Sequence, residues 1–412
     1  MIKRVKLGDI AEITVGYVGI MKSEYVSSGI PFFRSLNVNP YSIDESDLLY
    51  ISEEFSEKIR KSELHEDDLV IVRTGKPGTC SRVPPKFDGA NCSDLVIVRP
   101  DKNKVDVAYI EAYINHFAQK QISNQKVGAV QQHFNITAAK EMVLYLPELS
   151  AQKRIGSIVQ TLNNKIANNN AINAELEELA KTIYDYWFLQ FEFPNEEGLP
   201  YKSSGGKMVW SEELKREIPE GWCVEKLGDI VRNSSTSISA RKAKPYPYTP
   251  LEKIPSFKMS FGDFFDGENA KTSLLYYEKG AILFGSMRPY FHRVCIAPFS
   301  GVTRTTTFVL YPTLENTLGY AYETLNQNHV VKYATNSSVG TQQPYVEWAN
   351  SLEDFKIPHV PDKLKIQYSS LVQNMIELVI KNEIESHSLS ELRDWLLPML
   401  MNGQIGFKEQ ER

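Results

Sequence analysis

The chain contains the same pattern twice. The pentapeptide KLGDI at residues 6–10 returns at residues 226–230. Residues 69–77 also align with residues 281–289 without a gap. Solenoid repeats have periods of about 20–50 residues, and the two copies here lie much further apart, so the spacing predicts one duplicated domain and not an array. Two similar domains in one chain suit a target with two half-sites.

Composition allows two cores and shows no membrane or secretion signal. The chain has 412 residues, of which 42% are hydrophobic, and single cores rarely grow beyond about 250–300 residues. No apolar run approaches the ~18 residues of a membrane span, and the first residues lack the apolar core of a signal peptide. The four cysteines show no CxxC spacing, so we expect reduced thiols and a cytoplasmic protein.

The net charge of −5 counts against a simple DNA-binding protein, which normally carries a basic surface. The charge is uneven, however, because basic residues gather in predicted loops such as residues 241–244. An acidic scaffold with basic loops would bind DNA with low non-specific affinity, since that affinity scales with the number of phosphate contacts.

Strand, helix and linker signals divide this mixed α/β (α+β) chain into five segments. Apolar runs predict strands at residues 69–73, 95–98, 281–285 and 307–311, and helical spacing predicts a helix at 107–121. The predicted segments are a first globular domain (1–148), a long helix (149–194), a polar linker (195–217), a second globular domain (218–358) and a second long helix with a tail (359–412).

Both long helices carry heptad patterns. In the first, the a positions are Ile155, Leu162, Asn169, Leu176 and Ile183, and the d positions are Ile158, Lys165, Ile172, Leu179 and Tyr186. In the second, the a positions are Tyr368, Met375, Asn382, Leu389 and Leu396, and the d positions are Leu371, Leu378, Glu385, Leu392 and Met399. Apolar residues sustained at a and d predict coiled-coil packing through an a/d seam. We expect helix pairing through Leu162, Leu176, Met375 and Leu389.

Asn169 and Asn382 occupy equivalent a positions when the two heptad patterns are aligned. A buried asparagine at an a position costs stability and fixes the register of the two helices. The alternative is that both asparagines are partly exposed and only tolerated.

Repeated polar clusters are candidates for contact with DNA. One kind follows an apolar strand and joins glycines, which let the backbone approach a phosphate, to cations: Arg73, Thr74, Gly75, Lys76 and Gly78, then Ser286, Met287, Arg288 and Tyr290. A second kind offers side chains that pair with base edges: Gln131, Gln132, His133 and Asn135, then Gln342, Gln343 and Tyr345. The remaining candidates are Arg34, Ser35 and Asn37 beside aromatic residues, and Arg304 in the second half.

Each cluster also has a plain structural interpretation. The glycine-rich segments would also serve as turns with solvated cations. The glutamine segments would also serve as helix caps, and Arg34 could lie at a strand end with its aliphatic stem on apolar surface.

Motifs for catalysis, metals and cofactors are missing. The sequence has no Walker loop and no GxG, and its seven histidines form no HxxxH or HxH pair. The adjacent carboxylates Asp67 and Asp68 would point to opposite faces of a strand. We therefore predict a non-catalytic protein without a metal or cofactor.

Four motifs in order carry a family resemblance. They are the two copies of KLGDI, the second of them preceded by IPEGW at residues 218–222; LP at residues 146–147, which opens the first long helix; and LLPMLMNGQI at residues 396–405. Over essentially its whole length the chain resembles the DNA specificity subunits of type I restriction–modification systems.

The resemblance implies two target-recognition domains, each reading one half of a bipartite site in double-stranded DNA. It also implies that the long helices set the spacer and dock two methyltransferase subunits, and that restriction motor–nuclease subunits join the complex. Catalysis would belong to these partners and not to this chain.

Two equivalent partners further suggest pseudo-twofold symmetry, which makes the two helices antiparallel. Asn169 and Asn382 would then meet and satisfy each other's amides. A helix of about 37 residues spans roughly 55 Å, which exceeds one DNA turn of about 34–36 Å. We therefore expect the half-sites to be separated by several unread base pairs.

Two other functions fit the same residues. One is an orphan duplicated DNA-binding regulator that works without a methyltransferase. The other is a nuclease or methyltransferase whose motifs differ from the known ones. Methyl transfer by the isolated chain would favour the enzyme, whereas a neighbouring methyltransferase gene would favour the specificity subunit.

Overall fold

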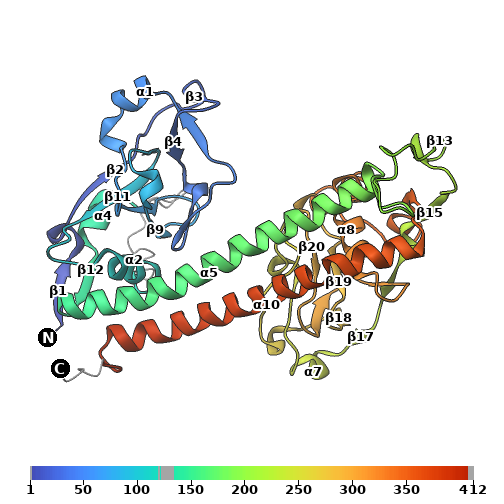
Figure 1. The fold of residues 1–412 in the computed structure, drawn as a ribbon. Coiled ribbons are helices and arrows are strands. Elements are labelled where there is room, and N and C mark those ends of the chain that lie inside the picture. Colours follow the sequence, from blue (N-terminus) through green and yellow to red (C-terminus); the bar gives the residue numbers. More distant parts are fainter. Residues whose placement is uncertain (1, 119–120, 122–133, 407–412) are drawn as a thin grey trace. The chain divides into compact units, whose positions relative to one another are not determined.

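The protein is described by a computed structural model that covers residues 2–118, 121 and 134–406. The chain divides into two compact units, Met1–Lys165 with Leu389–Arg412 (unit 1) and Ile166–Ser388 (unit 2). The two long helices, α5 (Leu149–Tyr184) and α10 (Asp362–Met401), each contribute residues to both units (Figure 1). The division between the units therefore falls inside the helices and not in a loop.

An antiparallel four-stranded sheet forms the centre of unit 1. Its order is β2 (Ala11–Val15), β11 (Leu95–Pro100), β8 (Leu69–Val72), β9 (Cys80–Arg82). Leu69 and Ile71 of β8 pack in the core that also holds helix α2 (Val107–His116). Val70 and Val72 point the other way, into a second core with Phe33. Both faces of the sheet are buried, which explains why its strands read as unbroken apolar runs.

Unit 2 repeats this sheet strand for strand. Its order is β16 (Val231–Ser234), β22 (Thr307–Pro312), β19 (Ile282–Gly285), β20 (Val294–Ile296). Ile282 and Phe284 face the core that holds helix α8 (Leu318–Asn326), and Leu283 faces a second core. The predicted strands are present with ends shifted by a residue or two, and the predicted helix at 107–121 is α2, which ends at His116. The duplication is therefore confirmed in the topology of the chain.

The KLGDI motif forms the same tight turn in both units. It follows β1 (Lys3–Lys6), paired with β12 (Val143–Leu146), and β15 (Val224–Lys226), paired with β23 (Lys356–Pro358). The backbone amide of Lys6 donates to Asp9, and that of Lys226 donates to Asp229 at 2.8 Å. A Cβ on Gly8 would lie only 3.1 Å from the Lys140 side chain. The motif repeats because a capped turn and a close backbone approach are needed twice.

The units differ in their smaller elements. Unit 1 has a mixed sheet of β10 (Asn91–Cys92), β4 (Ile30–Phe33), β7 (Leu49–Ile51) and β3 (Tyr25–Val26), the pair β5 (Val38–Asn39) and β6 (Ser42–Ile43), and helices α1 (Glu53–Lys58) and α4 (Ile136–Glu141). Unit 2 has an antiparallel sheet of β17 (Ser237–Ile238), β18 (Leu274–Tyr277) and β21 (Gly301–Arg304), and helices α6 (Leu227–Ile230), α7 (Ala240–Ala243) and α9 (Asn328–Asn336). None of the helices in the described ranges combines the length and apolar character of a membrane span.

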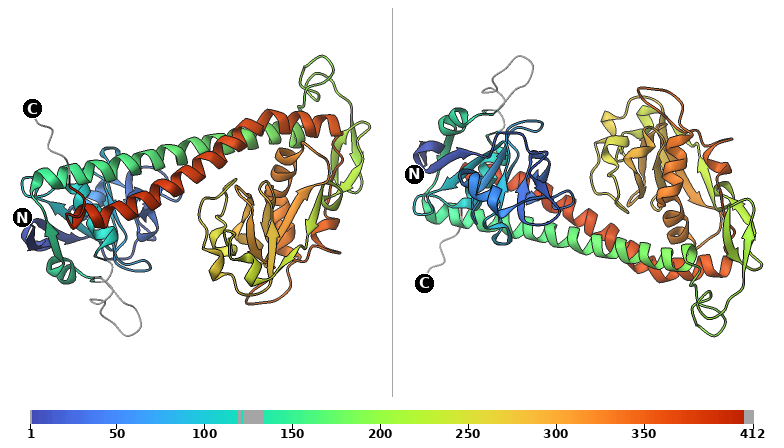
Figure 2. Two further views of the ribbon diagram at one scale, coloured as in Figure 1. Left: turned by 90° about the horizontal axis from the view of Figure 1, so that it is seen from below. Right: turned by 90° about the horizontal axis from the view of Figure 1, so that it is seen from above.

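Within unit 2, α5 and α10 lie side by side and run antiparallel (Figures 1 and 2). Asn169 and Asn382 are both buried, with 1% and 5% of their surfaces exposed. They do not bond to each other as expected. Asn169 Nδ2 donates to Glu385 at 2.8 Å and to Ser386 at 3.3 Å. Asn382 Nδ2 donates to Asn173 at 2.9 Å.

These bonds show that the helices meet through a and e positions. Asn173 and Ser386 are both e positions and match each other in the aligned heptads, so the two contacts repeat when the helices are exchanged. Apolar e residues are also buried, as Ala180, Val372 and Val379 show. The a residues Leu162, Leu176, Met375 and Leu389 are partly buried.

The prediction that the d residues pack in the seam between the helices is wrong. The d residues Ile172, Leu179, Leu371, Leu378 and Leu392 have between 40% and 48% of their surfaces exposed. A heptad pattern identifies apolar positions but does not identify what covers them. Each helix therefore carries a d stripe, defined here as its exposed apolar d residues, that nothing in the described chain buries.

The predicted polar linker contains an ordered hairpin, β13 (Met208–Ser211) and β14 (Arg216–Pro219). Phe193 stacks on Tyr201 at 4.7 Å and on Trp222 at 5.1 Å between ring centroids. Phe193 and Trp222, which flank the linker, and Tyr201 within it thus pack together around a glycine- and serine-rich segment, which the polar composition concealed.

Each long helix completes a core at its C-terminal end. Leu397, Leu400 and Met401 of α10 belong to the main core of unit 1. Ala180 and Tyr184 of α5 belong to the main core of unit 2, and the Tyr184 hydroxyl hydrogen-bonds to a threonine of α8.

Replacing Asn173 and Asn382 with alanine, singly and together, tests the polar layer of the helix pair. We expect each single change to cost about 1–3 kcal/mol of unfolding free energy, because it leaves a buried amide unpaired. The double change should cost less than the sum, by about 0.5–1.5 kcal/mol. Chemical denaturation measures all three values. Exposed Asn168→Ala is the control, and additive effects of the two changes would contradict the pairing.

Candidate nucleic-acid interface

The polar clusters of the second half meet at one hollow in unit 2. Its volume is about 320 Å³, and its walls include four residues predicted to contact DNA, Met287, Arg288, Arg304 and Gln343. They come from three separate segments: the loop after β19, the last residue of β21 and the loop after α9. The fold therefore brings together side chains that lie far apart in the sequence.

Backbone hydrogen bonds fix the loop after β19. The Arg288 amide donates to the Pro344 carbonyl at 2.7 Å, and the Val346 amide donates to the Ser286 carbonyl at 3.0 Å. Arg288 has a φ of 51°, in the left-handed region that costs a non-glycine residue roughly 1–2 kcal/mol. Strain of this kind persists only where surrounding bonds impose it, and it concentrates at functional sites.

The predicted residues of this loop and of the segment bonded to it have different exposures. Ser286 is buried, so its role is to hold the segment that carries Gln343. Tyr290 and Tyr345 have 49% and 44% of their surfaces exposed. The Arg288 guanidinium donates to the Gln342 carbonyl at 3.2 Å.

Among the arginines of this hollow, Arg304 has its guanidinium donors free to bind a ligand. It is exposed at the end of β21, and within the described ranges its side chain has no hydrogen bond and no ion pair. Its neighbour Arg293, by contrast, donates to the Leu251 carbonyl and lies over the Phe291 ring. A free guanidinium can make two parallel hydrogen bonds to a base edge or a phosphate.

Sequence reasoning missed Glu252, Phe291 and Arg293, which line the same hollow. None of them belongs to a segment that is repeated in the first half, and repetition is the signal that identified most of the candidates. A lone glutamate near arginines has no distinctive sequence pattern. The structure shows it as the acceptor in an otherwise cationic hollow.

In unit 1, Arg73 serves mainly to hold its own loop. Its guanidinium forms an ion pair with Asp94 and donates to the Phe134 carbonyl at 3.1 Å. The turn beyond it exposes Gly75 and Lys76, with Gly75 at a φ of 81° and Gly78 at 94°. The turn interpretation is therefore correct for the backbone, and Lys76 remains available to bind an anion.

Three other predicted contact residues are engaged inside unit 1. Arg34 is paired with Asp47 at 2.8 Å, and Asn37 is 2% exposed and accepts from the Arg34 amide. Asn135 caps helix α4 by accepting from the Ala138 amide at 2.8 Å. Their polar groups serve the local fold, and contact of these residues with DNA stays a prediction. Ser35 is partly exposed beside them, and Gln131, Gln132 and His133 lie outside the described residues.

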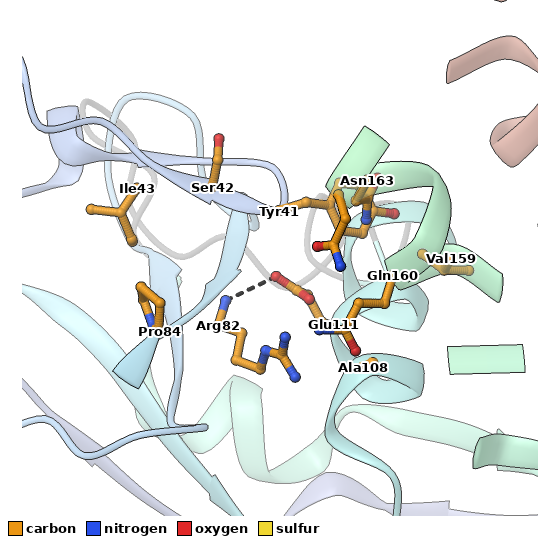
Figure 3. A pocket seen from close by; sticks show the side chains of 11 residues that line it. Tyr41, Ser42, Ile43, Arg82, Pro84, Ala108, Glu111, Val159, Gln160 and Asn163 are labelled. Carbon is orange, nitrogen blue, oxygen red and sulfur yellow. Dashed lines mark hydrogen bonds between the residues drawn. The ribbon is translucent and has the colours of Figure 1, made fainter. Parts of the chain in front are cut away.

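Unit 1 has a polar hollow of its own, of about 180 Å³, which lies where β9, α2 and α5 meet. Figure 3 shows Glu111 there, facing side chains such as Asn163 and Gln160 of α5. The Arg82 amide donates to its carboxylate at 2.8 Å. Burial raises the pKa of Glu111 to about 7. The hollow contains none of the predicted DNA contacts, so its chemistry belongs to the packing of α2.

Unit 2 buries a glutamate, Glu323, at the position that aligns with Glu111 in the same register as the repeated strands. Burial, assisted by Asp185, raises the pKa of Glu323 to about 8, and its Oε2 atom has no hydrogen-bond partner among the described residues. The duplication has therefore kept a buried carboxyl group behind both sheets.

Comparisons with known proteins agree with this architecture. Residues 2–178 match the model of the type I restriction modification DNA specificity domain. The chain is 25% identical to the type I restriction enzyme MjaIX specificity subunit of Methanocaldococcus jannaschii over 424 aligned residues, which cover 98% of this chain and 93% of that protein. It is 21% identical to the HindI specificity subunit of Haemophilus influenzae over 340 residues, which cover 69% and 74% of the two chains.

A solved structure shows the same fold. The crystal structure of the type I restriction–modification S subunit from M. genitalium superposes with a TM-score of 0.56 at 15% identity. The superposition covers 97% of this chain and 96% of that one.

The Glu323→Gln variant tests the buried carboxyl group. A carboxyl whose pKa is raised in the folded state stabilises the fold below its ordinary pKa, and this contribution is lost as pH rises through about 8. We therefore expect the variant to exceed the wild type in stability at pH 8, by on the order of 1–3 kcal/mol, and to match it near pH 4. Thermal unfolding across this range measures the difference. Exposed Glu315→Gln is the control, and parallel curves for wild type and Glu323→Gln would contradict the assignment.

Proposed function

Because the chain is similar over 98% of its length to a type I restriction enzyme specificity subunit, and residues 2–178 match the DNA specificity domain of that family, we propose that its two units each read one half of a bipartite DNA target. Proteins of this family are the non-catalytic members of their complexes, and catalysis lies in other subunits. In this proposal the present chain selects the site in double-stranded DNA, in the cytoplasm, and its partners modify or cut the DNA.

The observation that carries the proposal is the duplicated loop after β8 and β19. Both loops leave the third strand of the same sheet, and both are tied to a downstream segment, through Phe134 in unit 1 and Val346 in unit 2. Two equivalent loops on two equivalent sheets provide two readers in one polypeptide. A DNA-binding protein that reads one undivided site would not need the second loop.

The hollow in unit 2 has the chemistry that base reading requires. A free arginine favours guanine, a glutamine favours adenine, and a glutamate accepts from cytosine; Arg304, Gln343 and Glu252 supply these three groups. Lys76 in unit 1 is suited to a phosphate, which positions the DNA without reading it. The net charge of −5 keeps non-specific binding weak, so selection depends on these few contacts.

We assign the docking of methyltransferase subunits to the d stripes. Exposed apolar residues repeat every seventh position on both helices, for example Ile172 and Leu179 on α5 and Leu371 and Leu378 on α10. An uncovered stripe with heptad spacing fits a helix from another protein. The resemblance implies two such partners, together with motor–nuclease subunits, and the two long helices would then set the unread spacer between the half-sites.

Mapping methylated positions in cells that express this chain with its methyltransferase tests the whole proposal. We expect one bipartite motif that disappears when this chain is omitted. Methylation that is unchanged without the chain would contradict the proposal, and DNA binding by the chain with no methylation in any pairing would favour the orphan regulator.

Arg304→Ala tests the reading hollow. Loss of a bidentate contact to a base should weaken target binding by about 1–3 kcal/mol and relax one position of one half-site. Binding of the assembled complex to a set of single-base target variants measures both effects. Lys332→Ala on α9 removes an exposed charge of the same sign outside the hollow, and it should leave the motif unchanged. Relaxation in both half-sites, or in neither, would show that Arg304 does not read DNA.

Ile172→Asp with Leu179→Asp tests the d stripe of α5. A charge cannot be buried without a partner, so we expect the amount of methyltransferase that co-purifies with the chain to fall at least tenfold. Asn168→Asp with Asn170→Asp, on exposed positions of the same helix, is the matched control. Circular dichroism checks that the helix persists. Normal co-purification of the stripe variant would place the docking surface elsewhere.

A further inference from the structure

A second hollow in unit 2 adjoins the reading hollow. Its volume is about 420 Å³, and its walls include Tyr248, Phe265, Asn269 and Lys271. It shares Arg304 and Glu252 with the reading hollow. The two hollows are therefore neighbours that share one free arginine.

The two aromatic walls are held in place by the backbone. Tyr248 and Phe265 exchange reciprocal backbone hydrogen bonds of 2.8 Å, and the next amide, of Thr249, donates to the Val302 carbonyl. The two rings lie 6.4 Å apart between centroids at an angle of 39°. The Lys253 ammonium lies 4.2 Å from the centre of the Phe265 ring. The rings thus form a fixed, partly exposed aromatic surface and not a flexible patch.

The polar walls complement an anionic, planar ligand. Lys271 and Arg304 are exposed, and in the described part of the chain neither has an ion-pair partner. Asn269 donates to the Asp266 carbonyl at 3.2 Å, which leaves its side-chain oxygen to accept. Aromatic faces stack bases, cations bind phosphate, and amide and carboxylate groups read base edges. Ligand sites commonly measure about 300–1,000 Å³, so the hollow is large enough for one nucleotide.

We propose that this hollow receives one unstacked nucleotide of the bound DNA, with its base against Tyr248 and Phe265 and its phosphate beside Lys271. The inference rests on the proposed function, because it requires unit 2 to bind DNA. Unstacked bases are expected in such a complex, since methyltransferases turn their target base out of the duplex and leave its partner unpaired. A binding site for a displaced base would lower the cost of that distortion.

The site is specific to unit 2. The position in unit 1 that aligns with Arg304 is Cys92, in the same register that pairs the strands of the two sheets, and its side chain is fully buried. Unit 1 therefore has no cation at this point, and the proposed nucleotide belongs to the half-site that unit 2 reads.

The test uses the full chain assembled with its methyltransferase subunit on target DNA. A fluorescent base analogue, whose emission rises when it is unstacked, is placed at each position of the unit 2 half-site and its complement in turn. We expect a several-fold rise at a position where the rise is lost in Phe265→Ala and in Tyr248→Ala but retained in Tyr248→Phe. Trp210→Ala, an exposed aromatic residue of the β13–β14 hairpin, is the matched control and should keep the signal.

The possible results separate this inference from the proposed function. Specific binding in which every fluorescent signal survives both alanine variants overturns the hollow as a nucleotide site and leaves the proposed function intact. Absence of specific binding by the wild-type complex overturns both. Lys271→Ala provides an independent readout, because loss of one phosphate contact should reduce the slope of log affinity against log salt by about one. An unchanged slope would show that Lys271 does not contact a phosphate.

Discussion

The pairing of α5 with α10 is the contact on which both units depend. Its apolar a and e positions pack the helices together, and its centre is polar, with Asn169 bonded to Ser386 and Asn382 bonded to Asn173. Buried amides tolerate only a register in which they find partners, because an unpaired amide costs about 1–3 kcal/mol. A one-heptad slip in one direction would place Asn169 against Val379 and Asn382 against Ile166, and a slip in the other direction would place Asn382 against Ala180. The polar layer therefore determines which parts of each helix are supplied to each core.

The architecture could be predicted from the sequence because its signals are local and occur twice. Buried strands such as β8 and β19 show as apolar runs, and both long helices show as heptads. The choice of seam could not be predicted in the same way. Leu179 and Leu378 look like core residues, yet they are exposed in the chain by itself. Periodicity records every apolar stripe, whether or not another part of the chain buries it.

The candidate site was predicted in part. Arg288, Arg304 and Gln343 line one hollow, which the sequence did not predict, whereas Arg34 and Asn37 form hydrogen bonds within a turn. Polar residues at strand ends serve either a ligand or the backbone, and only the hydrogen bonds decide between the two. Glu252 and Tyr248 were missed because they belong to the second half alone. Repetition in the sequence identifies what the units share. The features that distinguish one unit from the other lie in segments that are not repeated.

The core of unit 1 has a consequence for how the chain is made. Unit 2 is one continuous stretch, Ile166–Ser388, but unit 1 also needs Leu397, Leu400 and Met401, which are translated after all of unit 2. The half that leaves the ribosome first is thus the last that can close its core. A chain that stops before these residues would retain a complete unit 2 and an unfinished unit 1. Both units therefore have all of their core residues only in chains that have been translated through Met401.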